Sequence, residues 1–309
     1  MLDGGFFQRY KSLEFIVQQL VEGFMTGLHK SPFHGFSVEF AEHRLYNQGE
    51  STRHIDWKLY ARTDKLFVKR YEEETNLRAY VIIDNSSSMH YPVVENPSVD
   101  RNINKSVFAA YAAGCVSYLL QQQRDATGLS VFSDEIDVFT PVRSSYDHLK
   151  FLYGEYEKLI SDYAPQQKKK SNVAESLHLI AEKIHKRSLI VLFTDMFDNY
   201  SDDEALFSAL QHLKYNKNEM ILFHVTDKNA EINLNLPDKP TRFIDMETKS
   251  ELKVNPRLLR KEYSDFQNKR INEIKSRCLQ YKIDFVDVDI SEGYNEIMLN
   301  FLKKRQRLM

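Results

Sequence analysis

The fold is decided by residues 79–88, which read AYVIIDNSSS. The first five of these residues are apolar without interruption, as expected for a strand that helices cover on both faces of a parallel sheet. The run ends on Asp84 and continues into three serines, so that a carboxylate and several hydroxyl groups directly follow a buried strand. We therefore read this stretch as one strand of an α/β sheet with a polar carboxyl end.

Strand-like and helix-like segments alternate on the carboxyl side of this strand. The predicted strands are 128–132, 136–142, 188–194, 220–226 and 283–288, and the predicted helices are 104–124, 146–160, 173–185, 203–213, 257–279 and 294–304. This alternation predicts an α/β domain with a doubly wound, mostly parallel sheet flanked by helices. Residues 231–252 lack a helical period, and apolar and Asn residues alternate at 232–236, so we expect a β-hairpin inserted there.

The residues before the first strand predict a separate, smaller unit. Apolar residues recur every three or four positions over 11–29, which predicts a helix that Pro32 cannot continue. Apolar residues then alternate at 36–40 and form a short run at 66–68, which predicts a small β-rich unit. We expect the domains to be 1–76 and 77–309.

The composition excludes several classes of protein. The 309 residues carry 42 Lys and Arg against 44 Asp and Glu, so no overall charge draws the chain to nucleic acid. Two cysteines are too few for a disulfide framework or a thiolate zinc site. The longest nearly uncharged apolar run, 107–120, falls short of the roughly 20 residues that span a bilayer, and residues 1–10 lack a secretory signal. We expect a cytoplasmic protein without a transmembrane segment.

Polar side chains follow or precede the predicted elements at three places. Asp84, Ser86 and Ser88 follow the first strand, Asp195 follows the strand that ends at 194, and Ser171 precedes a helix. Ligands of open α/β sheets bind at the carboxyl ends of the strands, so we expect these side chains to meet at one edge. Oxygen ligands with few charges suit a hard cation. The sequence therefore predicts a site for Mg²⁺, with Mn²⁺ or Ca²⁺ as alternatives.

The pattern Asp84-x-Ser86-x-Ser88 resembles the metal-ion-dependent adhesion site of von Willebrand factor A domains. Residues 171–177 (SNVAESL) look like that family's Thr-Asp-Leu-x-x-Ala-Leu, with Ser171 in place of Thr, and Thr194-Asp195 matches its Ser/Thr-Asp. The resemblance implies a von Willebrand factor A-like fold. It also implies an ion that Asp195 holds directly or through water, with one coordination position left for a carboxylate of a partner protein. A serine lacks the methyl group that restricts threonine, which implies weaker metal binding.

A block of residues upstream narrows the resemblance. In order, it comprises Ser31-Pro32, Gly35, Val38-Glu39-Phe40, Arg44-x-Tyr46, Gly49, Arg53-x-Ile55-Asp56-Trp57-Lys58, Ala61-Arg62-Thr63 and Leu66-x-Val68-Lys69. This block is similar to the signature of the bacterial "domain of unknown function 58" family, with Glu50 where the family usually has Asp. Members often carry two membrane helices and are commonly encoded beside MoxR-type AAA+ ATPases. The resemblance therefore implies such an ATPase, or its client, as partner.

Charges surround the only tryptophan of the chain. Arg53, Asp56, Trp57 and Arg62 lie within ten residues of one another. They form either an ion-pair network that docks the β-rich unit or a surface for a protein partner, since Trp and Arg are frequent interface anchors. The short basic runs 168–170 and 303–307 are read as solvated, with contact of the tail 303–307 to acidic lipid or a partner as the alternative.

Catalysis has no support in the sequence. A phosphatase with a nucleophilic Asp84 would need a second acid at Ser86, and a serine hydrolase would need glycines around its serine. We therefore predict a non-catalytic, metal-dependent interaction module, an adaptor of a MoxR-type ATPase in protein assembly or stress response. The alternatives are a scaffold in which these residues only cap helices without binding metal, and a metal-dependent hydrolase.

Overall fold

The computed structural model describes residues 12–29, 43–45, 57–69, 77–99, 103–162, 173–196, 203–244 and 251–308. The contacts between residues divide the chain into two units. Residues 1–24 and 77–309 form the larger unit, and residues 25–76 form the smaller one. The helix α2 (Leu13–His29) therefore begins in the larger unit, whereas the sequence assigned it to a domain ending at residue 76.

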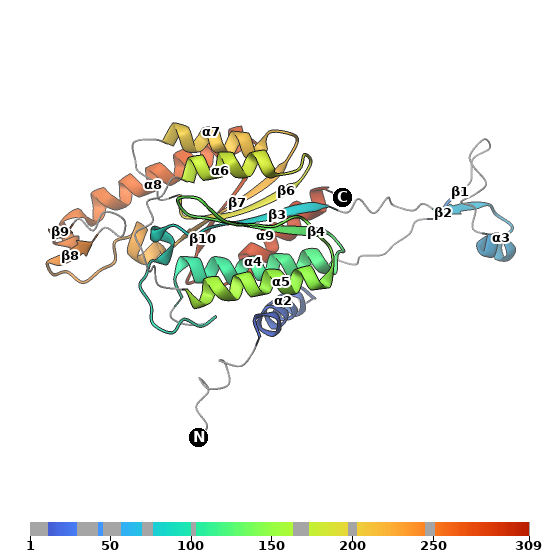
Figure 1. The fold of residues 1–309 in the computed structure, drawn as a ribbon, viewed down its shortest axis with the longest axis horizontal. Helices are drawn as coiled ribbons and strands as arrows, with labels where there is room; N and C mark the ends of the chain where they lie inside the picture. Colours follow the sequence, from blue (N-terminus) through green and yellow to red (C-terminus); the bar gives the residue numbers. More distant parts are fainter. Residues whose placement is uncertain are drawn as a thin grey trace, which may run out of the picture. The chain divides into compact units, whose positions relative to one another are not determined.

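A six-stranded sheet forms the centre of the larger unit (Figure 1). Its strands are β3 (Arg78–Asp84), β4 (Ala126–Phe132), β5 (Ile136–Phe139), β6 (Leu189–Thr194), β7 (Glu219–Thr226) and β10 (Asp284–Asp289). They lie in the order β10-β7-β6-β3-β4-β5, and only β5 runs antiparallel to its neighbour. The predicted doubly wound, mostly parallel sheet is confirmed.

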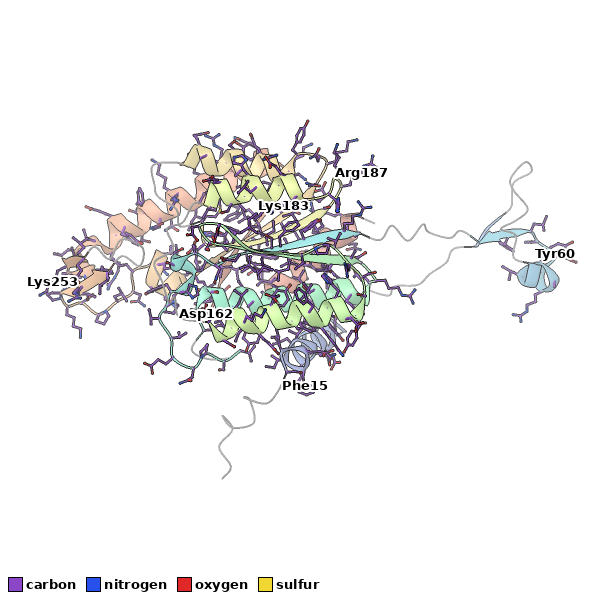
Figure 2. The ribbon with its side chains drawn as sticks, viewed as in Figure 1. Phe15, Tyr60, Asp162, Lys183, Arg187 and Lys253 are labelled. Carbon is purple, nitrogen blue, oxygen red and sulfur yellow. The ribbon has the colours of Figure 1, made fainter. Side chains whose placement is uncertain are left out.

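Helices cover both faces of the sheet (Figure 1). One face carries α4 (Lys105–Gln122), α5 (Tyr146–Ser161) and α9 (Asn295–Leu308); the other carries α6 (Val173–Lys183), α7 (Asp203–Lys214) and α8 (Pro256–Gln280). Side chains fill the layers between sheet and helices (Figure 2). Tyr80 and Ile82 belong to the core under α6 and α7, and alternate residues such as Val81 point to the other face. Burial on both sides explains why β3 is apolar throughout.

Helix α2 packs against α4 through a close contact. Val17 is fully buried, and a Cβ atom added to Gly114 of α4 would lie 2.9 Å from Val17 Cγ2. The backbone N–H of Leu13 donates a hydrogen bond of 3.0 Å to Glu157 of α5. Gly114 therefore permits the two helices to approach closely.

The smaller unit contains a helix that the sequence did not predict. Strand β1 (His43–Leu45) pairs antiparallel with β2 (Phe67–Lys69), and α3 (Trp57–Thr63) lies between them in sequence. The prediction of a β-rich unit missed α3, whose Lys, Leu, Ala and Arg residues favour helix. Asp64 follows the helix with a φ of 51°, a left-handed conformation common at helix ends. The predicted extended stretch 36–40 lies outside the described residues.

The inserted hairpin exists but begins later than predicted. Strands β8 (Thr241–Ile244) and β9 (Glu251–Val254) pair antiparallel, whereas residues 228–232 form the π-helical turn η3 (Lys228–Ile232). The Asp227 side chain accepts a hydrogen bond from Ala230 N at the start of this turn. The prediction of strand from residue 231 was therefore wrong, because local capping overrides the short alternating pattern.

The described helices include none that is both long and apolar enough to cross a lipid bilayer.

Candidate functional site

Asp84 and Thr194 meet at the carboxyl edge of the sheet. Strands β3 and β6 are parallel neighbours, with Ile83 opposite Phe193, so the residues that end the two strands lie at the same level. Thr194 Oγ1 donates a hydrogen bond of 2.6 Å to Asp84 Oδ2, and both residues are buried. The sheet register alone therefore brings the two predicted loops together.

Ser86 and Ser88 turn their hydroxyl groups toward each other beside Asp84. Ser86 N donates to Asp84 Oδ1 over 2.9 Å, and the hydroxyl groups of Ser86 and Ser88 form a hydrogen bond of 3.1 Å with each other. Ser86 precedes the 3₁₀ turn η2 (Ser87–His90), but its side chain makes no capping hydrogen bond to that turn. This geometry speaks against the alternative in which Ser86 merely caps a helix.

Asp195 forms a buried ion pair that the sequence analysis missed. Lys105 Nζ lies 2.8 Å from Asp195 Oδ2 and also contacts Glu231 Oε1. The Lys105 side chain has no exposed area, and the Asp195 and Glu231 side chains are 2% and 15% exposed. The element η3 supplies Glu231, and the first residue of α4 supplies Lys105. Among the described residues, the site thus combines the cationic side chain of Lys105 with the acidic side chains of Asp84, Asp195 and Glu231.

The Lys105 ammonium is charged in this setting. Burial alone would lower its pKa, but the charges of Asp195 and Glu231 raise the pKa above its ordinary value. The Lys105 side chain also lies 6.0 Å from the centre of the Tyr91 ring. A lysine in the first turn of α4 opposes the helix dipole, so the two carboxylates must compensate for that placement.

The pKa values of Asp84 and Glu231 are both raised at this edge. Burial, followed by the charge of Asp195, raises the pKa of Asp84 to about 7, and the hydrogen bonds from Thr194 and Ser86 oppose this rise. Burial and the charge of Asp195 also raise the pKa of Glu231 against the effect of Lys105. Negative charge is therefore concentrated at this edge beyond what Lys105 balances, and a bound cation would stabilise it.

The spacing of the Ser86 and Ser88 hydroxyl oxygens fits two ligands of a hard divalent cation. Two ligands at right angles around Mg²⁺ lie ~3.0 Å apart, since each lies ~2.1 Å from the ion, and the Ser86 and Ser88 oxygens are 3.1 Å apart. The described residues contain no group of three or more His, Cys, Asp or Glu side chains arranged to hold a metal. A site here would therefore combine carboxylates with hydroxyl groups, and it would favour Mg²⁺ or Mn²⁺ over metals that prefer nitrogen or sulfur.

Some of the predicted site residues belong to the described part of the chain, and others do not. Asp84, Ser86, Ser88 and Asp195 lie at one edge, as expected from the sequence. Ser171, Arg53 and Asp56 lie outside the described residues, as does the side chain of Trp57. Arg62 is exposed in the last turn of α3.

The position of Lys105 in the sequence could have indicated that it belongs to a charged site. It is the only charged residue of the helix α4, which is otherwise built of apolar and uncharged polar residues. A single charge at the start of such a buried helix indicates a paired site. Nothing in the local sequence around Glu231 indicates its partner.

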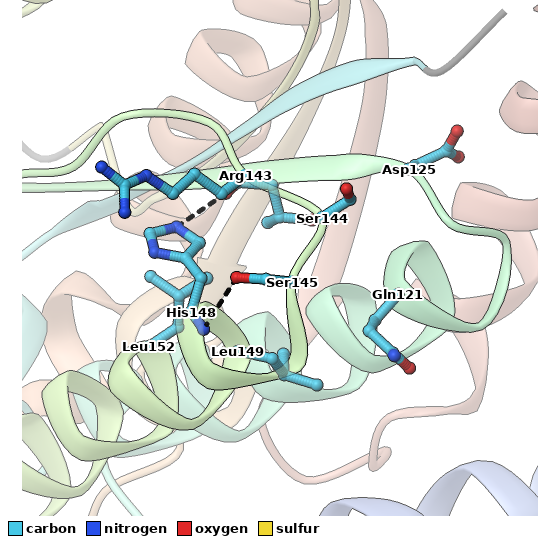
Figure 3. Close-up of a pocket in the computed structure, with 9 residues that line it drawn as sticks. Gln121, Asp125, Arg143, Ser144, Ser145, His148, Leu149 and Leu152 are labelled. Atoms are coloured by element: carbon cyan, nitrogen blue, oxygen red, sulfur yellow. Dashed lines mark hydrogen bonds between the residues drawn. The ribbon is translucent and has the colours of Figure 1, made fainter.

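A second hollow lies at the opposite edge of the sheet. Figure 3 shows His148 between Arg143 and Ser145, and His148 N donates to Ser145 Oγ over 3.3 Å. His148 Nε2 lies 3.0 Å from Thr127 O, near the amino end of β4, so this hollow is remote from Asp84. Burial lowers the pKa of His148.

Comparison with known proteins supplies the family. Residues 42–273 match the family described as "Protein of unknown function DUF58", which is well over half of the 309 residues. The chain belongs to the DUF58 family. The match confirms the resemblance seen in the upstream block. It includes the sheet strands from β3 to β7 and ends within α8, before β10. The DUF58 match therefore includes Asp84, Lys105, Asp195 and Glu231.

Two curated relatives are similar over part of their length. The uncharacterized proteins Mb1516 of Mycobacterium bovis and Rv1480 of Mycobacterium tuberculosis are each 25% identical to this DUF58 chain over 138 residues. The matched segment is 45% of this chain and 41% of each relative. The chain thus spans less than half the length of these relatives.

Solved structures with a similar fold share little sequence. BatB from Bacteroides thetaiotaomicron is 12% identical, with a TM-score of 0.41, covering 74% of this chain and 99% of BatB. An aerotolerance-related membrane protein from Bacteroides fragilis is 14% identical, with a TM-score of 0.43 and the same coverage. The von Willebrand factor A domain of SpRpn10 is 18% identical, with a TM-score of 0.34, covering 49% and 76%. The assignment to DUF58 therefore rests on the family match.

Proposed function

We propose that this DUF58 protein is a non-catalytic protein-interaction module whose recognition edge holds a divalent cation. Asp84, Ser86 and Ser88 would hold Mg²⁺ together with Ser171, and Asp195 would contact it directly or through water. The ion would supply a positive charge that a carboxylate of a partner protein can bind. The residues of this chain would hold the ion in position and exclude water from most of its coordination sphere.

One observation carries this proposal. The hydroxyl oxygens of Ser86 and Ser88 lie 3.1 Å apart beside Asp84, which is fully buried and close enough to Asp195 for that charge to raise its pKa. The carboxylates of Asp84 and Asp195 repel each other, and the ammonium of Lys105 offsets only part of this negative charge. Hydroxyl groups oriented beside them are suitable further ligands for a hard ion.

We further propose that the partner is a MoxR-type AAA+ ATPase or a client of one, acting in protein assembly or stress response. Membership of DUF58 supports this choice, because the family resemblance implies such ATPases as neighbours. A metal-bound carboxylate is a directional contact whose strength depends on how the loops are arranged. An ATPase that changes shape could therefore strengthen or release the contact.

Capture of the purified ATPase by the immobilised chain tests the proposal. We expect capture in Mg²⁺, loss of capture in chelator, and at least a tenfold weaker interaction for Ser86→Ala. Ser144→Ala is the matched control, because Ser144 is an exposed serine at the other edge of the sheet. Capture that persists equally in chelator and in Ser86→Ala would contradict metal-dependent recognition.

A further inference from the structure

The ion pair of Lys105 has a consequence for any cation that enters the site. Lys105 Nζ occupies one oxygen of Asp195 at 2.8 Å, and the same ammonium contacts Glu231. Asp195 lies close enough to Asp84 to raise its pKa. The residue that would help hold a divalent ion is thus already engaged by a positive charge of the chain itself.

We propose that Lys105 is a built-in cation that competes with the divalent ion for Asp195, and that Glu231 accepts the ammonium when the ion binds. This inference rests on the proposed metal-dependent function. It assigns Lys105 and Glu231 the role of residues that set the affinity of the site for its ion.

The charges of the site support this competition. Among the described residues, Asp84, Asp195 and Glu231 supply three carboxylates against the ammonium of Lys105, so these four groups together carry two net negative charges when all are ionised. A divalent ion would balance this remainder. A metal ion and an ammonium that share Asp195 repel each other, and each therefore weakens the binding of the other.

The contacts around Glu231 fit its role as the acceptor. Asp227 N donates to Glu231 Oε2 over 2.9 Å, which leaves Oε1 directed at Lys105. The Glu231 side chain is 15% exposed, whereas that of Asp195 is 2% exposed. Lys105 can therefore shift from Asp195 toward Glu231 without losing a charged partner, and the exchange would link the metal site to the turn η3.

A charge-matched double variant tests the competition. Lys105→Met with Glu231→Gln removes one positive and one negative charge, so the net charge of the site stays the same. Removal of both partners of a buried pair is also tolerated better than removal of one. We expect Mg²⁺ to bind this double variant roughly tenfold more tightly than the unchanged chain, measured by calorimetry, which corresponds to about 1.4 kcal/mol.

A second double variant provides the control. Lys304 and Glu219 form another ion pair at 2.7 Å, in which the Lys304 side chain is 9% exposed and the Glu219 side chain 37%, where β7 begins at the opposite edge of the sheet. Lys304→Met with Glu219→Gln should leave Mg²⁺ affinity unchanged. Glu231→Gln alone removes the group that would accept the ammonium, so Lys105 stays with Asp195 and Mg²⁺ binding should weaken. This single variant provides a test of the competition if the first double variant fails to fold.

The outcomes separate this inference from the proposed function. Equal or weaker Mg²⁺ binding by the first double variant overturns the competition while leaving a metal-binding function intact. Binding by the double variant but not by the unchanged chain supports the competition and overturns metal-dependent function. Absence of binding in both overturns both proposals.

Discussion

The side chain of Asp84 has no exposed surface. Burial and the charge of Asp195 raise the pKa of its carboxyl group to about 7. In the unfolded chain the same group has its ordinary pKa near 3.8. Between these two pH values the folded state keeps a proton that the unfolded state has lost. The contribution of Asp84 to the free energy of unfolding of the metal-free protein therefore falls as pH rises from about 4 to about 7.

Asp84→Asn should remove this pH dependence. In chelator we expect the variant to be more stable than the unchanged chain at pH 8, by on the order of a few kcal/mol, with little difference near pH 4. Urea unfolding at several pH values measures the effect. Asp134→Asn alters an exposed carboxylate and serves as control. A difference that stays constant across pH would contradict the perturbed state of Asp84.

Some residues of the candidate site could be predicted from the sequence, and others could not. Asp84, Ser86 and Asp195 could be predicted because each stands next to an apolar run, and the register of β3 and β6 then brings their loops together. Lys105 pairs with Asp195 over 90 positions and with Glu231 over 126. Such a pairing depends on which loops converge in three dimensions, so no local pattern could have predicted it.

At the scale of elements, the packing of α2 on α4 depends on Gly114. An added methyl group would lie 2.9 Å from Val17, closer than side chains normally approach. A valine in a helix has few alternative rotamers, so the helices would have to separate. Gly114 is thus a packing residue, even though glycine weakens a helix.

Gly114→Ala should therefore have opposite effects in two backgrounds. In the unchanged chain we expect destabilisation by about 1 kcal/mol, because overpacking outweighs the helix propensity gained. In Val17→Ala, which removes the obstructing methyl groups, the same change should stabilise the protein. Urea midpoints of the four proteins measure the coupling. The same effect in both backgrounds would refute the contact.

Most elements could be predicted because their apolar patterns are long. The strands from β3 to β10 in the sheet and the helices from α4 to α9 lie within a few residues of their expected positions. Short elements were harder, as α3 has seven residues and the hairpin strands have four each. In such elements capping and tertiary contacts outweigh a pattern of only two or three apolar residues.

At the scale of the whole molecule, the larger unit is a sheet that concentrates charge at one edge. Two loops that follow β3 and β6, the start of α4 and the turn η3 supply the charged and hydroxyl groups. The opposite edge carries the hollow around His148. The candidate cation site and the hollow around His148 thus lie at opposite edges of the sheet.

The central claim is that this edge binds one divalent cation, and electron paramagnetic resonance of Mn²⁺ tests it most directly. Titration of the metal-stripped chain should reveal one bound Mn²⁺ per chain, because free Mn²⁺ gives a sharp signal that binding removes. Asp84→Asn should lose this site, and Asp134→Asn should keep it. Mn²⁺ that remains free, or binding that is the same in Asp84→Asn, would contradict the account.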